Sequence, residues 1–150
     1  MIVVSNSSPL ITLARIGRLD LLTQLFGRVN IASEVYHEVV VRGAGRPAAD
    51  AVHGADWIDI HPAADSADLG ALRAQHALGA GEIATILLTR VLRADLVIID
   101  ERAARRLAQA RGVDVMGCVR ILERGHRRGL VPDLRQTFAD LVAHGIRIDR

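Results

Sequence analysis

The sequence contains no lysine, and all 19 of its basic residues are arginines. A phosphate-binding P-loop depends on its lysine, and Schiff-base catalysis depends on a side-chain amine, so both kinds of chemistry are excluded. Formal net charge is only +2. Any affinity for nucleic acid must therefore come from locally clustered arginines and not from the overall charge of the protein.

Cysteine and aromatic residues are also scarce. The single cysteine, Cys118, excludes an internal disulfide bond and a zinc cluster built from cysteines. One Trp, one Tyr and two Phe are too few for the base-stacking platforms of single-strand binding proteins. No apolar run approaches about 18 residues, and the first residues lack the basic flank of a signal peptide. We therefore expect a cytoplasmic protein with no membrane partner.

A length of 150 residues suits one domain with a hydrophobic core and is short for two typical domains. Half of the residues are hydrophobic, which is typical of a folded protein and not of a disordered tail. The sequence has no internal repeat and no low-complexity tract. We therefore expect residues 1–150 to form a single domain.

Apolar runs and helical patterns alternate along the chain. Ile2–Val4 and Leu96–Ile99 are apolar at every position, which is typical of parallel strands buried on both faces. Strands alternating with helices predict an α/β fold with a parallel sheet covered on both faces. The predicted strands are 2–5, 28–32, 57–60, 95–99 and 113–116, and the predicted helices are 9–26 with a break near Gly17, 33–42, 47–54, 66–78, 81–93, 101–111, 118–128 and 133–144.

Short polar side chains follow two of the predicted strands. Asn6 comes shortly after the first strand, and Asp100 comes directly after the fourth. In an open parallel sheet the ligand crevice lies just beyond the carboxyl ends of the strands, where both side chains would sit. Glu38 and Glu82, on predicted helices, are further candidates. Carboxylate and amide oxygens are ligands that Mg²⁺ accepts, so the sequence predicts an oxygen-rich magnesium site.

Each of these residues also has a purely structural interpretation, and the residues alone leave both interpretations open. Asp100 suits the N-cap of the helix 101–111, and Asn6 suits the N-cap of a helix that begins with Pro9. Glu82 lies in a first helical turn, where the helix dipole favours an acid. Glu38 could belong to a solvated acidic stripe.

Arginines follow Asp100 where the helix dipole disfavours them. Arg102, Arg105 and Arg106 lie in the first turn and a half of the predicted helix, so we expect another group to hold them there. That group is either a nearby carboxylate or a phosphodiester. Ser8, two residues after Asn6, is placed to reach a metal ion through a water molecule.

The ordered set of these motifs resembles the PIN-domain nucleases, and most closely a VapC-like toxin subfamily of the kind often left as a domain of unknown function. The resemblance covers nearly the whole chain. The residues that carry it are Asn6-Ser7-Ser8-Pro9-Leu10-Ile11 within Ile2–Leu22, then Glu38, Gly81-Glu82, Leu96-Val97-Ile98-Ile99-Asp100-Glu101-Arg102 and Arg127-Arg128-Gly129-Leu130-Val131-Pro132.

The resemblance implies a PIN-like three-layer α/β/α sandwich around a five-stranded parallel sheet. It further implies an endoribonuclease that uses Mg²⁺ or Mn²⁺ and acts as the toxin of a type II toxin–antitoxin pair, with a small antitoxin protein and a homodimer as partners. The implied catalytic residues are Glu38, Glu82 and Asp100; the metal ligands are these three with Asn6 and Glu101; and the RNA-binding residues are Ser8, Arg102 and Arg105.

Two departures from the family pattern remove charge from the implied site. The first acidic position is usually Asp but is Asn6 here, and Ala84 stands where the subfamily often has a further acid. The alternative is therefore a weakened or inactive PIN-fold protein that binds RNA or a partner protein. A third interpretation is an α/β domain that binds a small molecule. The lack of a glycine-rich phosphate loop after the first strand argues against it.

Overall fold

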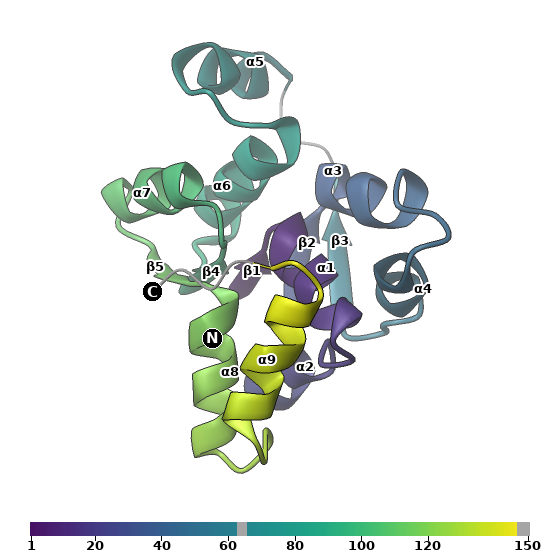
Figure 1. Cartoon of the computed structure of the whole chain (residues 1–150). Coiled ribbons are helices and arrows are strands. Elements are labelled where there is room, and N and C mark those ends of the chain that lie inside the picture. The colour runs from purple at the N-terminus through teal and green to yellow at the C-terminus, as the bar shows by residue number, and fades with distance from the viewer. Residues whose placement is uncertain (63–65, 147–150) are drawn as a thin grey trace.

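The computed structural model describes the chain at residues 1–62 and 66–146 (Figure 1). Five parallel strands form one sheet in the order β3-β2-β1-β4-β5. Each strand agrees with its prediction to within one residue at either end, so the strand predictions are confirmed. The strands are β1 (Val3–Ser5), β2 (Val29–Ala32), β3 (Ile58–His61), β4 (Leu96–Ile98) and β5 (Asp114–Met116).

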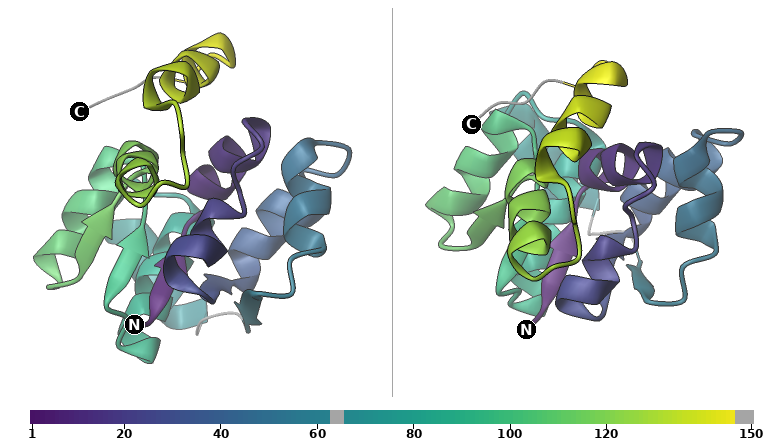
Figure 2. Two further views of the ribbon diagram at one scale, coloured as in Figure 1. Left: turned by 90° about the horizontal axis from the view of Figure 1, so that it is seen from below. Right: turned by 60° about the horizontal axis from the view of Figure 1, so that its bottom comes forward.

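Helices cover both faces of the sheet, and the α/β sandwich is confirmed (Figures 1 and 2). On one face α6 and α7 pack against the sheet, and on the other α1 and α2 lie against α8, with α9 outside it. The helices are α1 (Ser7–Arg15), α2 (Leu21–Phe26), α3 (Ser33–Tyr36), the π-helix η1 (His37–Val41), α4 (Pro47–His53), α5 (Ser66–Gln75), α6 (Ala80–Leu92), α7 (Arg102–Ala110), α8 (Cys118–Arg127) and α9 (Leu134–Ala143).

The core forms where the sequence is apolar at every position. Val3 and Val4 of β1 and Val97 and Ile98 of β4 are fully buried, because helices cover both sides of the central strands. In the register of the sheet, Val4 lies between Asn30 of β2 and Val97 of β4. The predicted helix break is confirmed by Gly17, whose φ of +70° turns the chain after α1.

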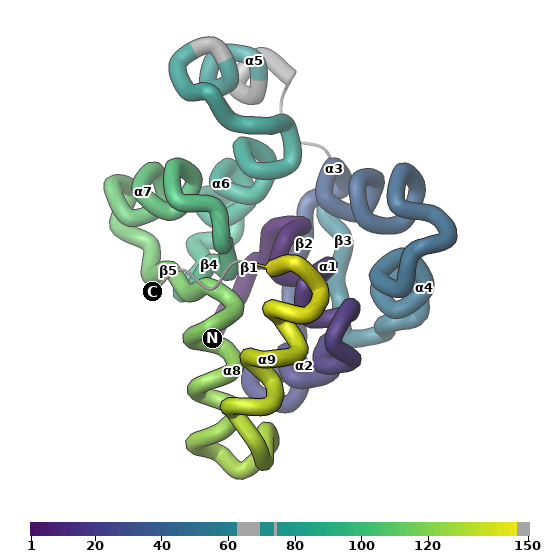
Figure 3. The backbone as a smooth tube through the Cα atoms, viewed as in Figure 1, coloured from purple at the N-terminus to yellow at the C-terminus, as the bar shows by residue number. Residues whose placement is uncertain are grey.

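The strand order places a crevice at the carboxyl end of β1. From β1 the chain continues to β2 and β3 on one side of β1, and it then crosses to β4 and β5 on the other side. The connections after β1 and after β4 therefore lead in opposite directions, which is where a crevice is expected. The backbone tube of Figure 3 shows α1 passing between α4 and the pair α8 and α9, and α1 contacts both α4 and α8. None of the described helices combines the length and apolar character that a bilayer crossing requires.

Candidate functional site

Asn6 lies at the centre of the crevice, directly after β1. Its backbone N–H donates to the carbonyl of Ile98 in β4 at 2.9 Å, and the residue is 2% exposed. The hydroxyl of Thr85 contacts Asn6 Oδ1 at 3.4 Å, but lies only 2.7 Å from the carbonyl of Gly81. A hydroxyl has one proton to donate, so the shorter bond to Gly81 dominates. Asn6 occupies the N-cap position of α1, as the structural interpretation expects, but its side chain makes no capping hydrogen bond.

Glu38 enters the same crevice from the π-helix η1. Its Oε2 accepts a hydrogen bond of 2.7 Å from the hydroxyl of Ser7, which is buried. The carboxylate also lies against the backbone of Gly81, where an added Cβ would come within 2.7 Å of Glu38 Cδ. A side chain at position 81 would therefore displace the carboxylate of Glu38 from the first turn of α6. Glu38 is thus part of the crevice and not of a solvated stripe.

Glu82 lies in the first turn of α6. Its Oε1 accepts a hydrogen bond of 3.3 Å from Gly79 N–H, whereas its Oε2 is buried and has no partner among the described residues. Burial raises the pKa of Glu82, against the effect of the Gly79 donor, and the negative charges of Glu101 and Glu38 raise it further. Buried polar atoms are almost always hydrogen-bonded, so an unpartnered carboxylate oxygen needs an explanation. A bound cation would provide one.

Asp100 and Glu101 are held by the N-termini of two different helices. Asp100 Oδ1 accepts a hydrogen bond of 2.7 Å from the N–H of Cys118, the first residue of α8. Glu101 caps α7 by accepting from Ala103 N–H at 3.1 Å and from Ala104 N–H at 2.8 Å. The interpretation of Asp100 as the cap of the helix 101–111 is therefore wrong, because its neighbour takes that position.

The pKa of Glu101 moves opposite to that of Glu82. Burial alone would raise it, but the two backbone donors, the neighbouring carboxyl group of Glu82 and the positive charge of Arg105 lower the pKa of Glu101 overall. The two neighbouring carboxyl groups therefore differ in protonation. The lowered pKa favours ionised Glu101, and the raised pKa favours protonated Glu82.

The cap of α8 gives a stability prediction for Asp100. We expect Asp100→Ala to lower the free energy of unfolding by about 0.5–2 kcal/mol, because the N–H of Cys118 loses its acceptor. Asp100→Asn keeps an acceptor oxygen and is expected to lose much less. Urea unfolding of both variants, followed by circular dichroism, measures the difference. Equal stability of the two variants would show that this hydrogen bond does not support α8.

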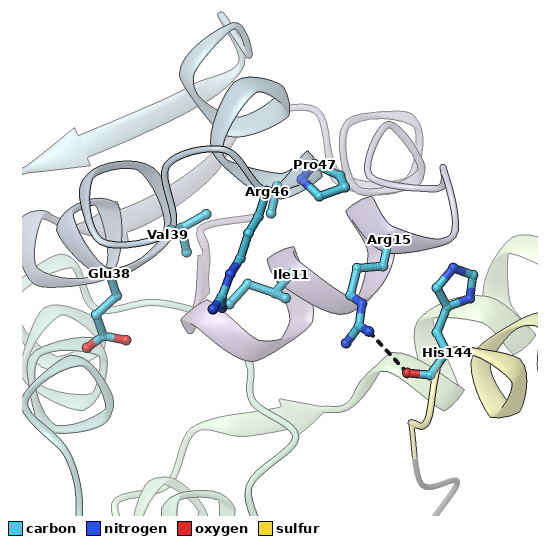
Figure 4. Close-up of a pocket in the computed structure, with 9 residues that line it drawn as sticks. Ile11, Arg15, Glu38, Val39, Arg46, Pro47 and His144 are labelled. Carbon is cyan, nitrogen blue, oxygen red and sulfur yellow. Dashed lines mark hydrogen bonds between the residues drawn. The ribbon is translucent and has the colours of Figure 1, made fainter.

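Two cavities flank α1 and divide the candidate residues. A cleft of about 470 Å³ is lined by Asp100, Ser8 and Arg105, and also by residues of α8 and α9. Glu38 instead borders a cavity of about 360 Å³ on the side of α1 that faces α4 (Figure 4). Arg102, at the exposed start of α7, does not line either cavity.

The structure therefore brings together some of the predicted ligands. Glu38, Glu82 and Glu101 are close enough to act on one another's charge, with Asn6 beside them, whereas the carboxylate of Asp100 is bound at α8. Within residues 1–62 and 66–146, no three acidic, histidine or cysteine side chains converge tightly enough to ligate one ion as they stand.

The donor set nevertheless fits a hard divalent cation. All the candidate atoms are carboxylate or amide oxygens, and the unpartnered Oε2 of Glu82 lies among like charges that a cation would neutralise. Asp100 accepts from the N–H of Cys118 through Oδ1 alone, and each oxygen of Glu101 accepts one backbone hydrogen bond. Both carboxylates therefore keep lone pairs with which they can ligate an ion while they hold the N-termini of α8 and α7.

Sequence reasoning missed three residues that shape the crevice: Ser7, Gly81 as a contact of Glu38, and Thr85. Ser7 and Glu38 are 31 residues apart and meet because the helical segments that carry them follow β1 and β2, which are parallel neighbours in the sheet. No local pattern marks that meeting. In the sequence, Gly81-Glu82 stands at the start of a predicted helix. The glycine in this pair was the signal that another group could approach the backbone closely there.

A family model described as a PIN domain matches residues 2–150, which include every residue of the crevice. No curated protein matches the chain. The family match spans the whole sheet and all the helices that carry the acidic residues, and the chain therefore belongs to the PIN-domain family.

Proposed function

We propose that this protein is an endoribonuclease that depends on Mg²⁺ or Mn²⁺. PIN domains are generally metal-dependent nucleases, which supports the reaction class. The single observation that carries the proposal is the buried, unpartnered Oε2 of Glu82 beside two other glutamates. Like charges gathered in a crevice repel one another without a cation, and the same charges can hold a cation when one is bound.

The residues of the crevice divide into ligands and groups that position them. Glu38 and Glu82 would hold the ion, with the amide oxygen of Asn6 and the carboxylates of Asp100 and Glu101 as further ligands. The hydroxyl of Ser7 orients Glu38 by its 2.7 Å hydrogen bond. When bound, a divalent cation supplies neutralisation of charge on the scissile phosphate and a lowered pKa of water.

The RNA strand would reach the site through the cleft beside Asp100. Arg105 lines this cleft and is half-buried, and Ser8 is exposed in the same cleft. The charge of Arg105 acts on Glu101, but among the described residues its side chain makes no hydrogen bond or close ion pair, so its N–H groups are available to a phosphate. Arg102 is a further contact of the strand in this proposal.

We extend the proposal to a VapC-like toxin of a type II toxin–antitoxin pair, acting in the cytoplasm as a homodimer. The support for this step is the resemblance of Asn6–Ile11 and Arg127–Pro132 to that subfamily. Such a toxin is expected to arrest growth when expressed alone. A short upstream reading frame that overlaps this one, and whose product relieves the arrest, would identify the antitoxin.

The cleavage test uses the purified chain, single-stranded RNA and three conditions: Mg²⁺, Mn²⁺ and EDTA. We expect cleavage only with a divalent ion, and we expect Asp100→Asn to lower its rate at least about tenfold. The asparagine keeps an acceptor for Cys118, so loss of the fold does not explain a loss of rate. Equal cleavage by both proteins would reject the assignment of Asp100, and cleavage in EDTA would reject the metal.

A second candidate function is a PIN-fold protein of weak or no activity that binds RNA or a partner protein. The uncharged Asn6 at the centre of the crevice favours it, as does the engagement of Asp100 and Glu101 by helix N-termini. Restoring a carboxylate at position 6 separates the two candidates.

A further inference from the structure

The cavity that Glu38 borders extends away from the acidic crevice, along the side of α1 that faces α4 (Figure 4). Its volume is about 360 Å³, which lies within the range of small-ligand sites. One end belongs to the crevice through Glu38, and His144 of α9's C-terminal end closes the other. None of the catalytic roles assigned above uses the space between these two ends.

Two arginines enter this space from different helices. Arg15, in the last turn of α1, donates from Nη2 to the backbone carbonyl of His144 at 3.1 Å. This bond orients the guanidinium, and its other N–H groups have no partner within residues 1–62 and 66–146. Arg46 precedes α4 and is exposed, and Figure 4 shows its guanidinium extending toward Ile11. Within the described chain, Arg46 makes no side-chain hydrogen bond or ion pair.

The rest of the cavity surface is mainly aliphatic. Val39 and Ala48 are buried, Ile11 is half-buried and Pro47 is exposed, and together they form the apolar part of the cavity wall. A ligand that suits this surface must carry negative charge at one part and an apolar face at another. A nucleotide has both, and a cavity of this size holds about one.

We propose that this cavity is a nucleotide subsite, in which Arg15 and Arg46 bind a phosphate that flanks the scissile bond while the base or sugar lies on Ile11 and Pro47. The inference rests on the proposed nuclease function, because Glu38 joins the subsite to the metal-binding crevice. The substrate strand then crosses the N-terminus of α1, with Arg105 in the cleft on one side and Arg46 on the other. Arg15 and Arg46 are positioning residues and do not touch the reacting atoms.

The test measures binding without cleavage. Fluorescence anisotropy of a labelled, single-stranded oligoribonucleotide is followed in EDTA over a series of salt concentrations, for the full chain and for Arg46→Ala. We expect the variant to bind about five- to tenfold more weakly, and its plot of log K against log salt to be shallower by about 0.7, the contribution of one phosphate contact. A strand of the same sequence in DNA shows whether the sugar contributes.

The matched control is Arg111→Ala. Arg111 is exposed just after α7, which starts beyond the carboxyl end of β4 and runs back, so it lies at the opposite edge of the sheet. Its removal changes the net charge equally and should leave both affinity and slope unchanged. Far-UV circular dichroism checks that both variants fold.

The outcomes separate this inference from the nuclease itself. RNA binding that falls equally in both variants, or in neither, overturns the subsite even if the chain cleaves RNA. Binding that depends on Arg46 in a chain that cleaves nothing with Mg²⁺ or Mn²⁺ supports the subsite and rejects the nuclease. A chain that binds no RNA at all overturns both, and leaves the cavity to a protein partner.

Discussion

Replacing Glu82 with glutamine is expected to lower the affinity for Mg²⁺ or Mn²⁺ by at least about 100-fold and to stabilise the metal-free protein at neutral pH. Loss of an outer-shell partner already costs about 10–100-fold in metal affinity, so loss of a ligand's charge should cost no less. The stability gain has a separate cause. Burial and the charges of Glu101 and Glu38 disfavour ionised Glu82, whereas the glutamine amide is neutral and can donate to those carboxylates.

The gain in stability should depend on pH in a defined direction. The pKa of Glu82 is raised in the folded protein by burial and by neighbouring negative charge. A raised pKa leaves stability intact below the unfolded-state value of about 4.3 and reduces it as the pH rises through the folded-state value. Glu82→Gln should therefore resemble the unaltered protein in acid and exceed it in stability at neutral pH.

Urea unfolding in EDTA, at acidic and neutral pH, measures the stability, and calorimetric titration with Mn²⁺ measures the affinity. The matched control is Glu34→Gln, on α3 four residues before Glu38 and hydrogen-bonded to Ser33. The control should leave the metal affinity unchanged. If Glu82→Gln instead lowers stability and leaves metal affinity intact, Glu82 serves only the first turn of α6.

The sheet could be predicted because its strands carry their own evidence. A strand covered by helices on both faces must be apolar at every position. A continuously apolar run such as Leu96–Ile99 fits few elements other than a strand of this kind. Gly17 could be interpreted for a similar reason, because the turn after α1 needs a positive φ, which glycine adopts more readily than other residues. The crevice follows from the same reasoning, since the ends of adjacent parallel strands share one edge.

The orientation of each acid within the crevice could not be predicted in this way. Asp100 and Glu101 are neighbours that both suit a helix N-terminus. Their position in the sequence does not decide which of the two caps α7. The choice depends on α8, whose first N–H reaches Asp100 because β5 lies next to β4. The contact of Glu38 with Ser7 and Gly81 depends in the same way on how distant elements pack.

Asn6→Asp is expected to destabilise the metal-free protein by about 3 kcal/mol at neutral pH and to bind a divalent ion more tightly. Position 6 is 2% exposed, and among the described residues its side-chain oxygen has only the long contact with Thr85 as support. A carboxylate there is buried, unpaired and close to the acids of the crevice, which is the unfavourable case for a charge. Saturating Mg²⁺ or Mn²⁺ should restore the lost stability, because an ion that binds only the folded state stabilises it.

The matched control is Asn30→Asp, since Asn30 is the chain's other asparagine and lies in β2, opposite Val4. Its Nδ2 donates to the carbonyl of Val3 at 3.0 Å, and its Oδ1 lies 2.8 Å from Nε2 of His61. The control keeps the second contact and loses the first, so it should also lose stability, but a metal should not restore it. Rescue of Asn6→Asp alone therefore places the ion at the end of β1, and equal rescue or none in the two variants contradicts the site. If rescue is accompanied by a large increase in RNA cleavage, the native amide limits the reaction. If cleavage stays absent, the missing charge at position 6 is not what limits the reaction.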